Sequence, residues 1–147
     1  MSIKVIIEES VDYEDIKIII KCPKVDDRIT HLIDQLKQYE VTLIGKKNGS
    51  IYSLVSNDLY YIESVDNKSF LYNENEIYES DVKLYEFEKF VEGTNFIRIS
   101  KNLIVNTTYV DSVRALFNGK FEATLTNDEK VIVNRHYVKA FKRKFIK

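Results

Sequence analysis

Hydrophobic and polar positions follow two different patterns along the chain, and the change between them lies at about residue 40. Before it, the segments IKVIIEE (residues 3–9) and DIKIIIKC (residues 15–22) alternate as short strands do, and Pro23 ends the second. The segment VDDRITHLIDQLKQYE then has one apolar stripe at helical spacing, with Asp26 or Asp27 available as its N-cap. The stripe consists of Ile29, Leu32, Ile33 and Leu36. Residues 1–40 are therefore predicted to form a β-β-α appendage that is too small to be stable without packing on something else.

From about Val41 onward the pattern is that of many short strands. Strands are predicted over VTLIGKK, SIYSLV, DLYYIESV, SFLY, IYES, FIRIS, LIVN, SVRALF, KFEATL and KVIV. Ser80 and Gly93 can begin and end a helix over DVKLYEFEKFV, and the basic segment RHYVKAFKRKFIK is predicted to form the last helix. Asn118 and Gly119, between two apolar runs, favour a two-residue type I′ hairpin turn. The chain is thus predicted to be mainly β, of the α+β class, with residues 41–147 as its main domain.

The composition agrees with a folded protein rich in sheet. Of the 147 residues 44% are hydrophobic, and ten Tyr and eight Phe favour strands, while one Pro and four Gly leave no room for a flexible linker. No apolar run approaches the roughly 20 residues of a membrane span, and Met1 is not followed by a signal peptide. The single Cys22 excludes an internal disulfide, which is typical of a reducing compartment. These features predict a cytoplasmic protein.

The formal net charge of −1 conceals a strong separation of charge along the chain. Residues 1–93 carry 11 Lys and Arg against 19 Asp and Glu, whereas residues 94–147 carry 11 against 4. From Lys130 onward there are seven basic residues and no acidic one. A basic last helix also complements its own dipole, but the separation indicates a basic surface that a polyanion can use.

The residue types that catalysis or metal binding needs are scattered. His31 and His136 lie in separate predicted helices, and together with Cys22 they form neither a zinc-ligand cluster nor a nucleophile–base pair. The sequence contains neither GxxxxGK[ST] nor GxGxxG, so no phosphate-binding loop is indicated. We therefore expect a protein that is not an enzyme and that holds no metal or cofactor.

Basic and amide side chains stand where predicted strands end. They are Lys68, then Lys101 with Asn102, then Arg135 with His136. Side chains at strand ends can project beyond a sheet, and loops on a rigid sheet often hold binding residues. Arg, Lys and Asn can read base edges in the major groove of DNA, whereas the cations of the last helix would pair with phosphates. This second group comprises Lys139, Lys142 and Arg143.

Each of these positions also has a purely structural interpretation. Lys101 can be a solvated turn residue, and Asn102 can close that turn. Arg98 can be a salt-bridging strand residue, Arg135 can cover the start of the last helix, and Asn106 can fasten a loop through bonds to the backbone. Position alone does not decide between the two interpretations.

Three functions are compatible with these observations. The first is sequence-specific binding of double-stranded DNA. The second is binding of single-stranded RNA or DNA on a sheet that exposes its Tyr and Phe side chains for base stacking. The third is a protein-interaction module whose basic tail binds an acidic partner.

Four segments together resemble a known family. FIRISKNLIVN, VDSVRALFNGKFEATL and KVIVNRHYVKAFKRKF are similar to the signature of the LytTR domain, the DNA-binding domain of LytTR-type bacterial regulators, and YYIESVDNKSFLY resembles its earlier strand-turn-strand. The resemblance covers about residues 44–147. It implies an elongated, multi-sheet β fold whose inter-strand loops enter successive major grooves of promoter DNA, unlike a recognition helix.

Three loops face DNA in such domains, and the resemblance places them at three positions of this chain. They fall near Lys68 or Ser69, at Lys101, and at Arg135. Several relatives have histidine at the first position and asparagine or arginine at the second, so the preferred bases do not transfer to this chain. Arg135 keeps the residue type of the family.

Many LytTR-type regulators begin with a receiver domain that contains a phosphorylatable aspartate, and 40 residues are too few for one. The resemblance therefore implies a stand-alone regulator. The partners it implies are promoter DNA, a second copy of the chain on repeated half-sites, and a membrane protein that controls the regulator. The stripe on the first helix can serve a dimer, or it can pack on the chain's own main domain.

Overall fold

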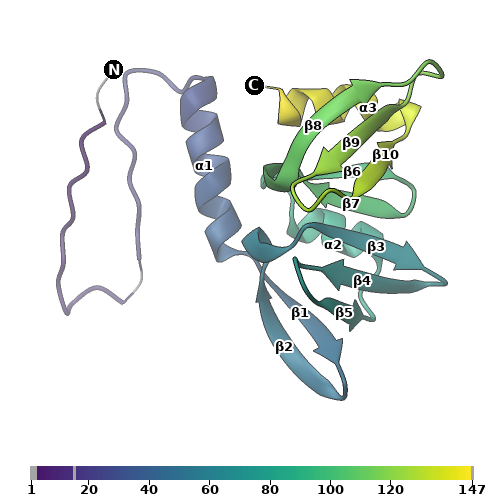
Figure 1. Cartoon of the computed structure of the whole chain (residues 1–147). Helices are drawn as coiled ribbons and strands as arrows, with labels where there is room; N and C mark the ends of the chain where they lie inside the picture. The colour runs from purple at the N-terminus through teal and green to yellow at the C-terminus, as the bar shows by residue number, and fades with distance from the viewer. Residues whose placement is uncertain (1–2, 15, 147) are drawn as a thin grey trace.

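The computed structural model describes residues 3–14 and 16–146, apart from the side chains of residues 38–40. These residues form two antiparallel sheets, three α-helices and two 3-10 helices, shown in Figure 1. In chain order the elements are α1 (Asp27–Glu40), β1 (Thr42–Lys47), β2 (Ser50–Val55), η1 (Ser56–Asp58), β3 (Tyr61–Val65), β4 (Lys68–Tyr72), β5 (Ile77–Ser80), α2 (Leu84–Phe90), β6 (Phe96–Ser100), β7 (Leu103–Asn106), η2 (Thr107–Tyr109), β8 (Val110–Ala115), β9 (Phe121–Leu125), β10 (Lys130–Val133) and α3 (Arg135–Phe145). The predicted mainly β fold with a few short helices is confirmed.

The larger sheet has the strand order β2-β1-β5-β4-β3-β7-β6. Two of its hairpins close with two-residue turns in which both residues have positive φ, namely Asn48 (51°) with Gly49 (81°) and Asp66 (50°) with Asn67 (66°). This is the geometry of a type I′ turn, which matches the twist of the flanking strands. The turns thereby fix the register of β1 with β2 and of β3 with β4.

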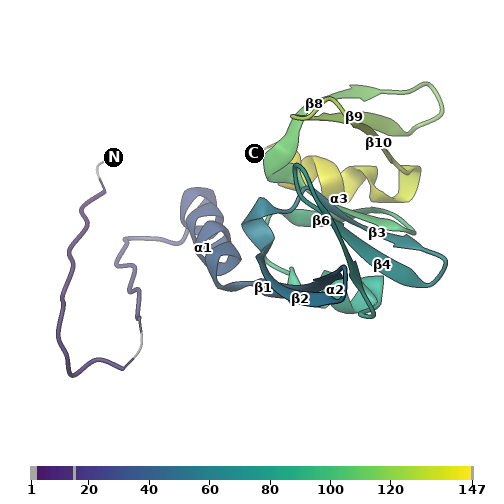
Figure 2. The same ribbon diagram turned by 60° about the horizontal axis from the view of Figure 1, so that its bottom comes forward.

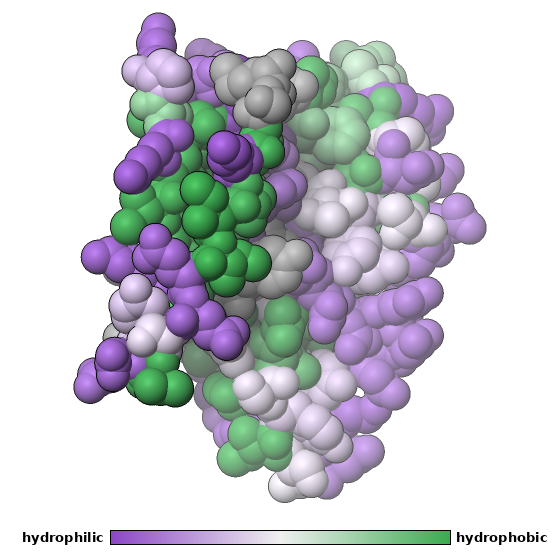
Figure 3. Space-filling view, turned by 90° about the vertical axis from the view of Figure 1, so that its left-hand side faces the viewer, coloured by the Kyte–Doolittle hydropathy of each residue, from purple (hydrophilic) through white to green (hydrophobic). Residues whose placement is uncertain are grey.

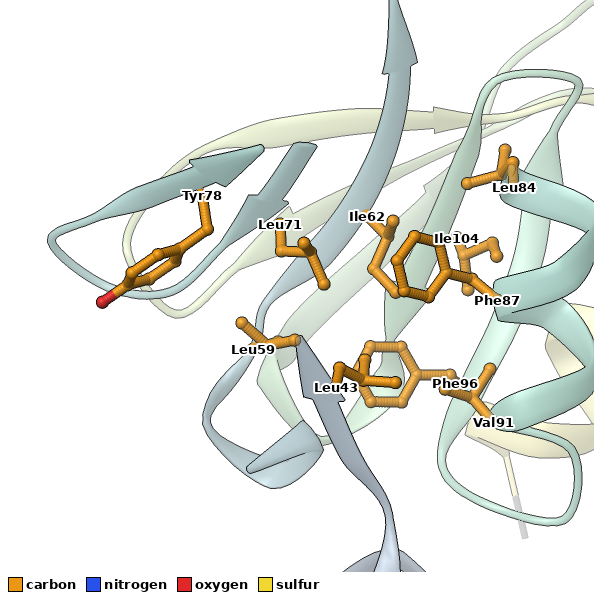
Figure 4. Close-up of a cluster of buried hydrophobic side chains, with 10 residues drawn as sticks. All are labelled: Leu43, Leu59, Ile62, Leu71, Tyr78, Leu84, Phe87, Val91, Phe96 and Ile104. Carbon is orange, nitrogen blue, oxygen red and sulfur yellow. The ribbon is translucent and has the colours of Figure 1, made fainter. Parts of the chain in front are cut away.

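A first hydrophobic core lies between the larger sheet and α2. Figure 4 shows its ten side chains. Most come from strands of the sheet and from α2, while Leu59 directly follows η1 and Val91 directly follows α2. They are Leu43, Leu59, Ile62, Leu71, Tyr78, Leu84, Phe87, Val91, Phe96 and Ile104. Because alternate residues of a strand face opposite sides, β1 turns its other side chains towards solvent, whereas Ile97, Ile99, Leu103 and Val105 of β6 and β7 enter a second core.

A second core joins the smaller sheet, of order β10-β9-β8, to the end of the larger one. α3 lies between the two sheets, as Figure 2 shows, and contacts both β6 and β10. Its Phe141 is fully buried among Ile99 and Val105 from the larger sheet and Ala123 and Val133 from the smaller one. The basic last helix is therefore anchored on an apolar stripe, and its cations remain for the surface.

The two strands predicted in the N-terminal appendage are wrong for the residues that the structure describes. Residues 3–14 and 16–26 contain no strand, and Asp15, where the second was expected to begin, lies outside the described residues. The hydrogen bonds in this segment are local, such as that from the Tyr13 N–H to the Ser10 carbonyl. Alternation makes a segment competent to form a strand, but a strand also needs a neighbour to complete its hydrogen bonds.

The helix predicted after this segment is confirmed as α1. The Asp26 carboxylate accepts from the N–H groups of Ile29 and Arg28, as an N-cap does, and these bonds hold the pKa of Asp26 below its usual value. The apolar stripe of α1 is half-buried within this single chain, and the helix contacts η1. A Cβ atom on Gly93 would lie 3.6 Å from Lys37 Cδ, so the side chain of Lys37 on α1 lies near Gly93.

Two predicted details of the main domain are also wrong. Asn118 does not have a positive φ, so the β8–β9 connection is not a type I′ turn; Gly119 (φ 84°) alone is left-handed, and Leu116 pairs with Lys120 across a three-residue loop. The second helix begins at Leu84, not directly after Ser80, which is buried at the end of β5.

Candidate nucleic-acid interface

Strand pairing brings the β3–β4 turn, residues 66–67, next to the β6–β7 turn, Lys101 and Asn102. β3 runs antiparallel to β7 with Glu63 opposite Leu103, and the Ser64 N–H donates to the Asn102 carbonyl at 2.8 Å. The end of β3 therefore lies beside the start of β7, and two turns that are distant in sequence become neighbours.

The start of α3 and the β8–β9 turn join the same edge. The Asn134 N–H donates to the Ile99 carbonyl at 2.8 Å, which places Arg135, the first residue of α3, beside the end of β6. A Cβ atom on Gly119 would lie 3.0 Å from Arg135 Cδ, so the arginine stem covers the β8–β9 turn. Figure 1 draws these turns along its right-hand side. We call residues 66–67, 101–102, 117–119 and 134–135 the loop edge.

Arg98 fastens the β6–β7 turn. Its Nε donates to the Ser100 carbonyl at 2.8 Å, its Nη2 donates to the Lys101 carbonyl, and its Nη1 lies 3.3 Å from Glu88 Oε1. The side chain is only 17% exposed, and a register shift of the strand pair lies at the same place. Because the turn carbonyls are held by one guanidinium, the exposed side chains of Lys101 and Asn102 project from a fixed backbone.

A second basic side chain fastens the β3–β4 turn. Lys83 Nζ donates to the Asn67 carbonyl at 2.9 Å. Lys68 follows this turn as the first residue of β4 and is exposed, with its Nζ 2.8 Å from Glu79 Oε1. The hydrogen bond to Glu79, followed by the charge of that carboxylate, raises the pKa of Lys68. Lys68 is therefore cationic but already paired, and a ligand would have to displace Glu79.

The side chain of Ser69, predicted as a DNA contact, is turned into the protein. It is 2% exposed, and its hydroxyl donates to the Val82 carbonyl at 2.6 Å. The reason is the pleat of β4: when Lys68 faces solvent, its neighbour faces the core.

The basic side chains of α3 form one exposed stripe that begins at the loop edge. Its members are Arg135, His136, Lys139, Lys142 and Arg143, which lie on the side of the helix opposite Phe141. Lys142 Nζ is 4.8 Å from the centroid of the Phe121 ring, a cation–π contact. Lys144 has turned inward instead, where its Nζ donates to the Thr94 carbonyl at 2.6 Å.

The loop edge offers hydrogen-bond donors that the protein itself does not use. Among the described residues none pairs with Lys101 Nζ, with the Asn102 side-chain amide or with the Arg135 guanidinium. Such donors, held side by side on fixed turns, fit the acceptor atoms of guanine and adenine edges and of phosphates.

Two aromatic side chains of the larger sheet, Tyr61 and Tyr72, are engaged within the protein. Tyr61 and Tyr72 stack on each other with their ring centroids 4.3 Å apart. The Tyr61 hydroxyl donates to Glu129 at 2.8 Å and the Tyr72 hydroxyl to Glu63 at 2.9 Å. Burial, then the bond to Glu63, raises the pKa of Tyr72 to about 12. The two rings cover each other, and the carboxylates of Glu129 and Glu63 beside them would repel the phosphates of a nucleic-acid strand.

The sequence did not identify the two residues that hold the turns, Arg98 and Lys83. Arg98 was interpreted as a salt-bridging strand residue, and its ion pair with Glu88 is only one of its three contacts. No sequence signal distinguishes such an arginine from any other on a strand, because its acceptors are carbonyls of a turn whose shape depends on folding. The prediction that Asn106 fastens a loop is confirmed, since its amide donates to the Leu59 carbonyl at 2.9 Å and accepts from the Thr108 N–H at 3.0 Å.

Neither a metal site nor a membrane-spanning helix is found in the described part of the chain. Residues 3–14 and 16–146 contain no group of three or more His, Cys, Asp or Glu side chains placed to hold a metal ion. None of the helices formed by these residues has the length and apolar character of a membrane span.

Comparison with known proteins places this geometry in a family. The family model "LytTr DNA-binding domain" matches residues 49–146. The structure is similar to the LytTr DNA-binding domain of a methyl-accepting/DNA response regulator from Bacillus cereus, with a TM-score of 0.67 and 21% identity over 73% of this chain and 98% of that one.

Curated relatives extend the comparison. The transcriptional regulatory protein LytR of Staphylococcus aureus is 32% identical over 119 residues, which are 81% of this chain and 39% of that protein. The sensory transduction protein LytT of Enterococcus faecalis is 30% identical over 94 residues, 64% of this chain and 39% of that protein. The chain thus spans well under half the length of these two relatives. On the match of the family model and of the fold, this chain belongs to the LytTr DNA-binding domain family.

Proposed function

We propose that this chain is a bacterial transcriptional regulator that binds double-stranded promoter DNA in a sequence-specific way, with its loop edge in successive major grooves. The observation that carries the proposal is the convergence of unpaired donors from distant parts of the chain, Lys101, Asn102 and Arg135, on that one edge. Membership of a DNA-binding family and similarity to transcriptional regulators support it. The role requires no catalysis, and it is exercised in the cytoplasm.

The residues divide into two roles. Arg135 and Lys101, with Asn102 beside them, read base edges, and Lys68 joins them when phosphate or base acceptors displace it from Glu79. The stripe of α3 behind Arg135 pairs with phosphates, which adds affinity but no sequence information. His136, Lys139, Lys142 and Arg143 belong to this second group.

Selection of bound sequences from a random duplex pool tests the proposal, followed by affinity measurements on the selected duplex. We expect Arg135→Ala and Lys101→Ala each to weaken binding by about 1–3 kcal/mol and to relax base preference at separate positions. Lys130→Ala is the matched control: it also removes one exposed cation, but from the end of β10 that lies away from Arg135. If no sequence is enriched, or if both loop-edge variants bind like the control, the proposal is wrong.

The salt dependence of binding separates the two roles. Lys142→Ala should weaken binding to every duplex alike and reduce the slope of log affinity against log salt by about 1. Its cation–π contact with Phe121 is at the surface, so the fold should persist. A sequence-dependent loss for this variant would contradict the assignment to phosphate.

The chain binds DNA, in this proposal, as a homodimer on two repeated half-sites about one helical turn apart. Such half-sites should be visible among the selected duplexes as a repeat with a spacing of about 10 base pairs. A membrane protein that controls the regulator stays a prediction of the family resemblance.

A further inference from the structure

The N-terminal arm, residues 3–14 and 16–25, exposes an unusual amount of apolar surface. Ten of its large apolar side chains are between 59% and 101% exposed, namely Ile3, Val5, Ile6, Ile7, Val11, Tyr13, Ile16, Ile18, Ile19 and Val25. Figure 3, which looks onto the side of the molecule where the arm lies, shows hydrophobic side chains gathered there. Single exposed apolar residues are normal, but a contiguous set of this size marks an interaction surface.

The arm has the residue types of strands without the hydrogen bonds of strands. Its apolar residues are mostly β-branched, which suits a pleated sheet. The hydrogen bonds found within it join only residues 10–13, around its bend, so its backbone N–H and C=O groups are free to pair with another extended segment.

Charge divides the arm into two complementary limbs. Residues 3–14 contain Lys4 against Glu8, Glu9, Asp12 and Glu14, whereas residues 16–24 contain Lys17, Lys21 and Lys24 and no acid. We call residues 3–14 the acidic limb and residues 16–24 the basic limb. Two limbs of the same sign repel each other, and an acidic limb attracts a basic one. Opposite charges on facing strands stabilise the pairing, and like charges destabilise it.

We propose that the occupant of this surface is the arm of a second copy of the chain. In a two-fold dimer the acidic limb of each copy pairs with the basic limb of the other, which gives two identical contacts. A hairpin within one chain would satisfy the same charges, but an isolated two-stranded hairpin is marginal in water, and the apolar face of each limb, Ile3, Val5 and Ile7 or Ile16 and Ile18, would stay exposed. In the dimer the two limb pairs can pack these apolar faces against each other and so bury them.

This arrangement is compatible with the rest of the molecule. The apolar stripe of α1, the other candidate for a dimer contact, is already half-buried within one chain. The arm lies on the side of the molecule opposite the loop edge in Figure 1, so pairing through the arms leaves both loop edges open to DNA. The inference rests on the proposed dimeric mode of binding, but its test requires no DNA.

Two charge variants of the full chain test the proposal. The basic-arm variant has Glu8→Lys, Glu9→Lys and Glu14→Lys, and the acidic-arm variant has Lys17→Glu, Lys21→Glu and Lys24→Glu. All six side chains are exposed, so the main domain should keep its circular-dichroism spectrum. Each variant alone now has two limbs of one sign, and we expect its self-association constant to fall about tenfold or more relative to the wild type.

The decisive sample is the mixture of the two variants, studied by analytical ultracentrifugation and native mass spectrometry. If the arms pair between copies, each variant alone is mainly monomeric at concentrations where the wild type is a dimer, and the mixture forms a one-to-one heterodimer. The control variant Glu74→Lys, Glu92→Lys and Asp111→Lys carries the same change in net charge on exposed residues outside the arm and should dimerise as the wild type does.

Three results would overturn the proposal. They are a monomeric wild type at every concentration, a mixture that stays monomeric, and variants that dimerise alone as well as the wild type does. A hairpin within one chain predicts the first result. The selected-duplex experiment measures DNA binding independently of self-association. A failure of the arm proposal therefore does not affect the DNA-binding role of the loop edge, and a failure of that role does not affect the arm proposal.

Discussion

Replacing Arg98 by methionine should uncouple the β6–β7 turn from the rest of the sheet. Methionine fills much of the same space but removes the donors to the Ser100 and Lys101 carbonyls and to Glu88. If Arg98 holds the turn that presents Lys101, the variant should lose DNA binding although the residue is largely covered and does not itself face the ligand.

The size of the loss has a physical limit. A hydrogen bond from a charged donor contributes about 1.5–3 kcal/mol, and bonds near the surface lie at the low end of that range. We therefore expect the free energy of unfolding to fall by about 2–3 kcal/mol. A domain with the usual free energy of unfolding of about 5–15 kcal/mol stays folded after such a loss. The loss in DNA binding is limited to the contacts that the turn presents through Lys101 and Asn102, each about 1–3 kcal/mol or about 5- to 150-fold in affinity.

A double-mutant cycle on the selected duplex measures the coupling. Affinities are determined for the wild type, Arg98→Met, Lys101→Ala and the double variant. Because Arg98 acts through the turn that presents Lys101, the double variant should lose less affinity than the sum of the two single effects, whereas independent residues would lose that sum. Glu88→Gln is the matched control, since it removes the ion pair of Arg98 and leaves both turn carbonyls bonded.

Arg98→Lys separates geometry from charge. Lysine keeps the positive charge but has one nitrogen in place of three, so it cannot bond both carbonyls and Glu88 together. We expect it to bind DNA almost as weakly as Arg98→Met. Additive losses in the cycle, or wild-type affinity for Arg98→Lys, would refute the positioning role.

Three further predictions concern other parts of the structure. Gly119→Ala places a Cβ atom 3.0 Å from Arg135 Cδ at a residue with left-handed φ, so it should lower the free energy of unfolding by about 1 kcal/mol and also weaken DNA binding. Gly49→Ala, at φ 81° with no atom within 4 Å, should lower stability alone. Equal DNA affinities of the two variants would contradict this prediction. The pKa of Tyr72 is raised from 10.0 to about 12, so its neutral hydroxyl contributes stability that is complete below pH 10 and is lost as pH rises through 12. Urea unfolding at several alkaline pH values should show this decline in stability, and Tyr72→Phe should make the decline smaller. Asn106→Ala leaves the buried Leu59 carbonyl without its donor and should lower the free energy of unfolding by about 1–3 kcal/mol, with an unchanged value as the contrary result.

Local pattern in the sequence was sufficient for most elements of this protein and for its family. The helices α1 and α3 and the strands of the main domain follow from their periodicity, because burial on one face imposes a period of 3.6 or 2 whatever the rest of the fold does. The same reasoning located Lys101 and Arg135 at strand ends, where side chains can project. It does not show what depends on a neighbour: the pleat turns the Ser69 side chain inward, and arm residues 3–14 and 16–25 form no strand within the described part of the chain.

Only the tertiary structure decided which strand ends meet. Alternation shows that β3 and β7 are strands, but it does not show that they pair, since any two strands can satisfy each other's hydrogen bonds. That pairing, and the bond from Asn134 to the Ile99 carbonyl, turns three scattered sites into one loop edge. Arg98 likewise bonds to backbone carbonyls of a turn. Every residue has a backbone carbonyl, so the sequence does not show which of them will accept. Position in space, set by packing and strand register, is what gathers these residue types on one edge of the molecule.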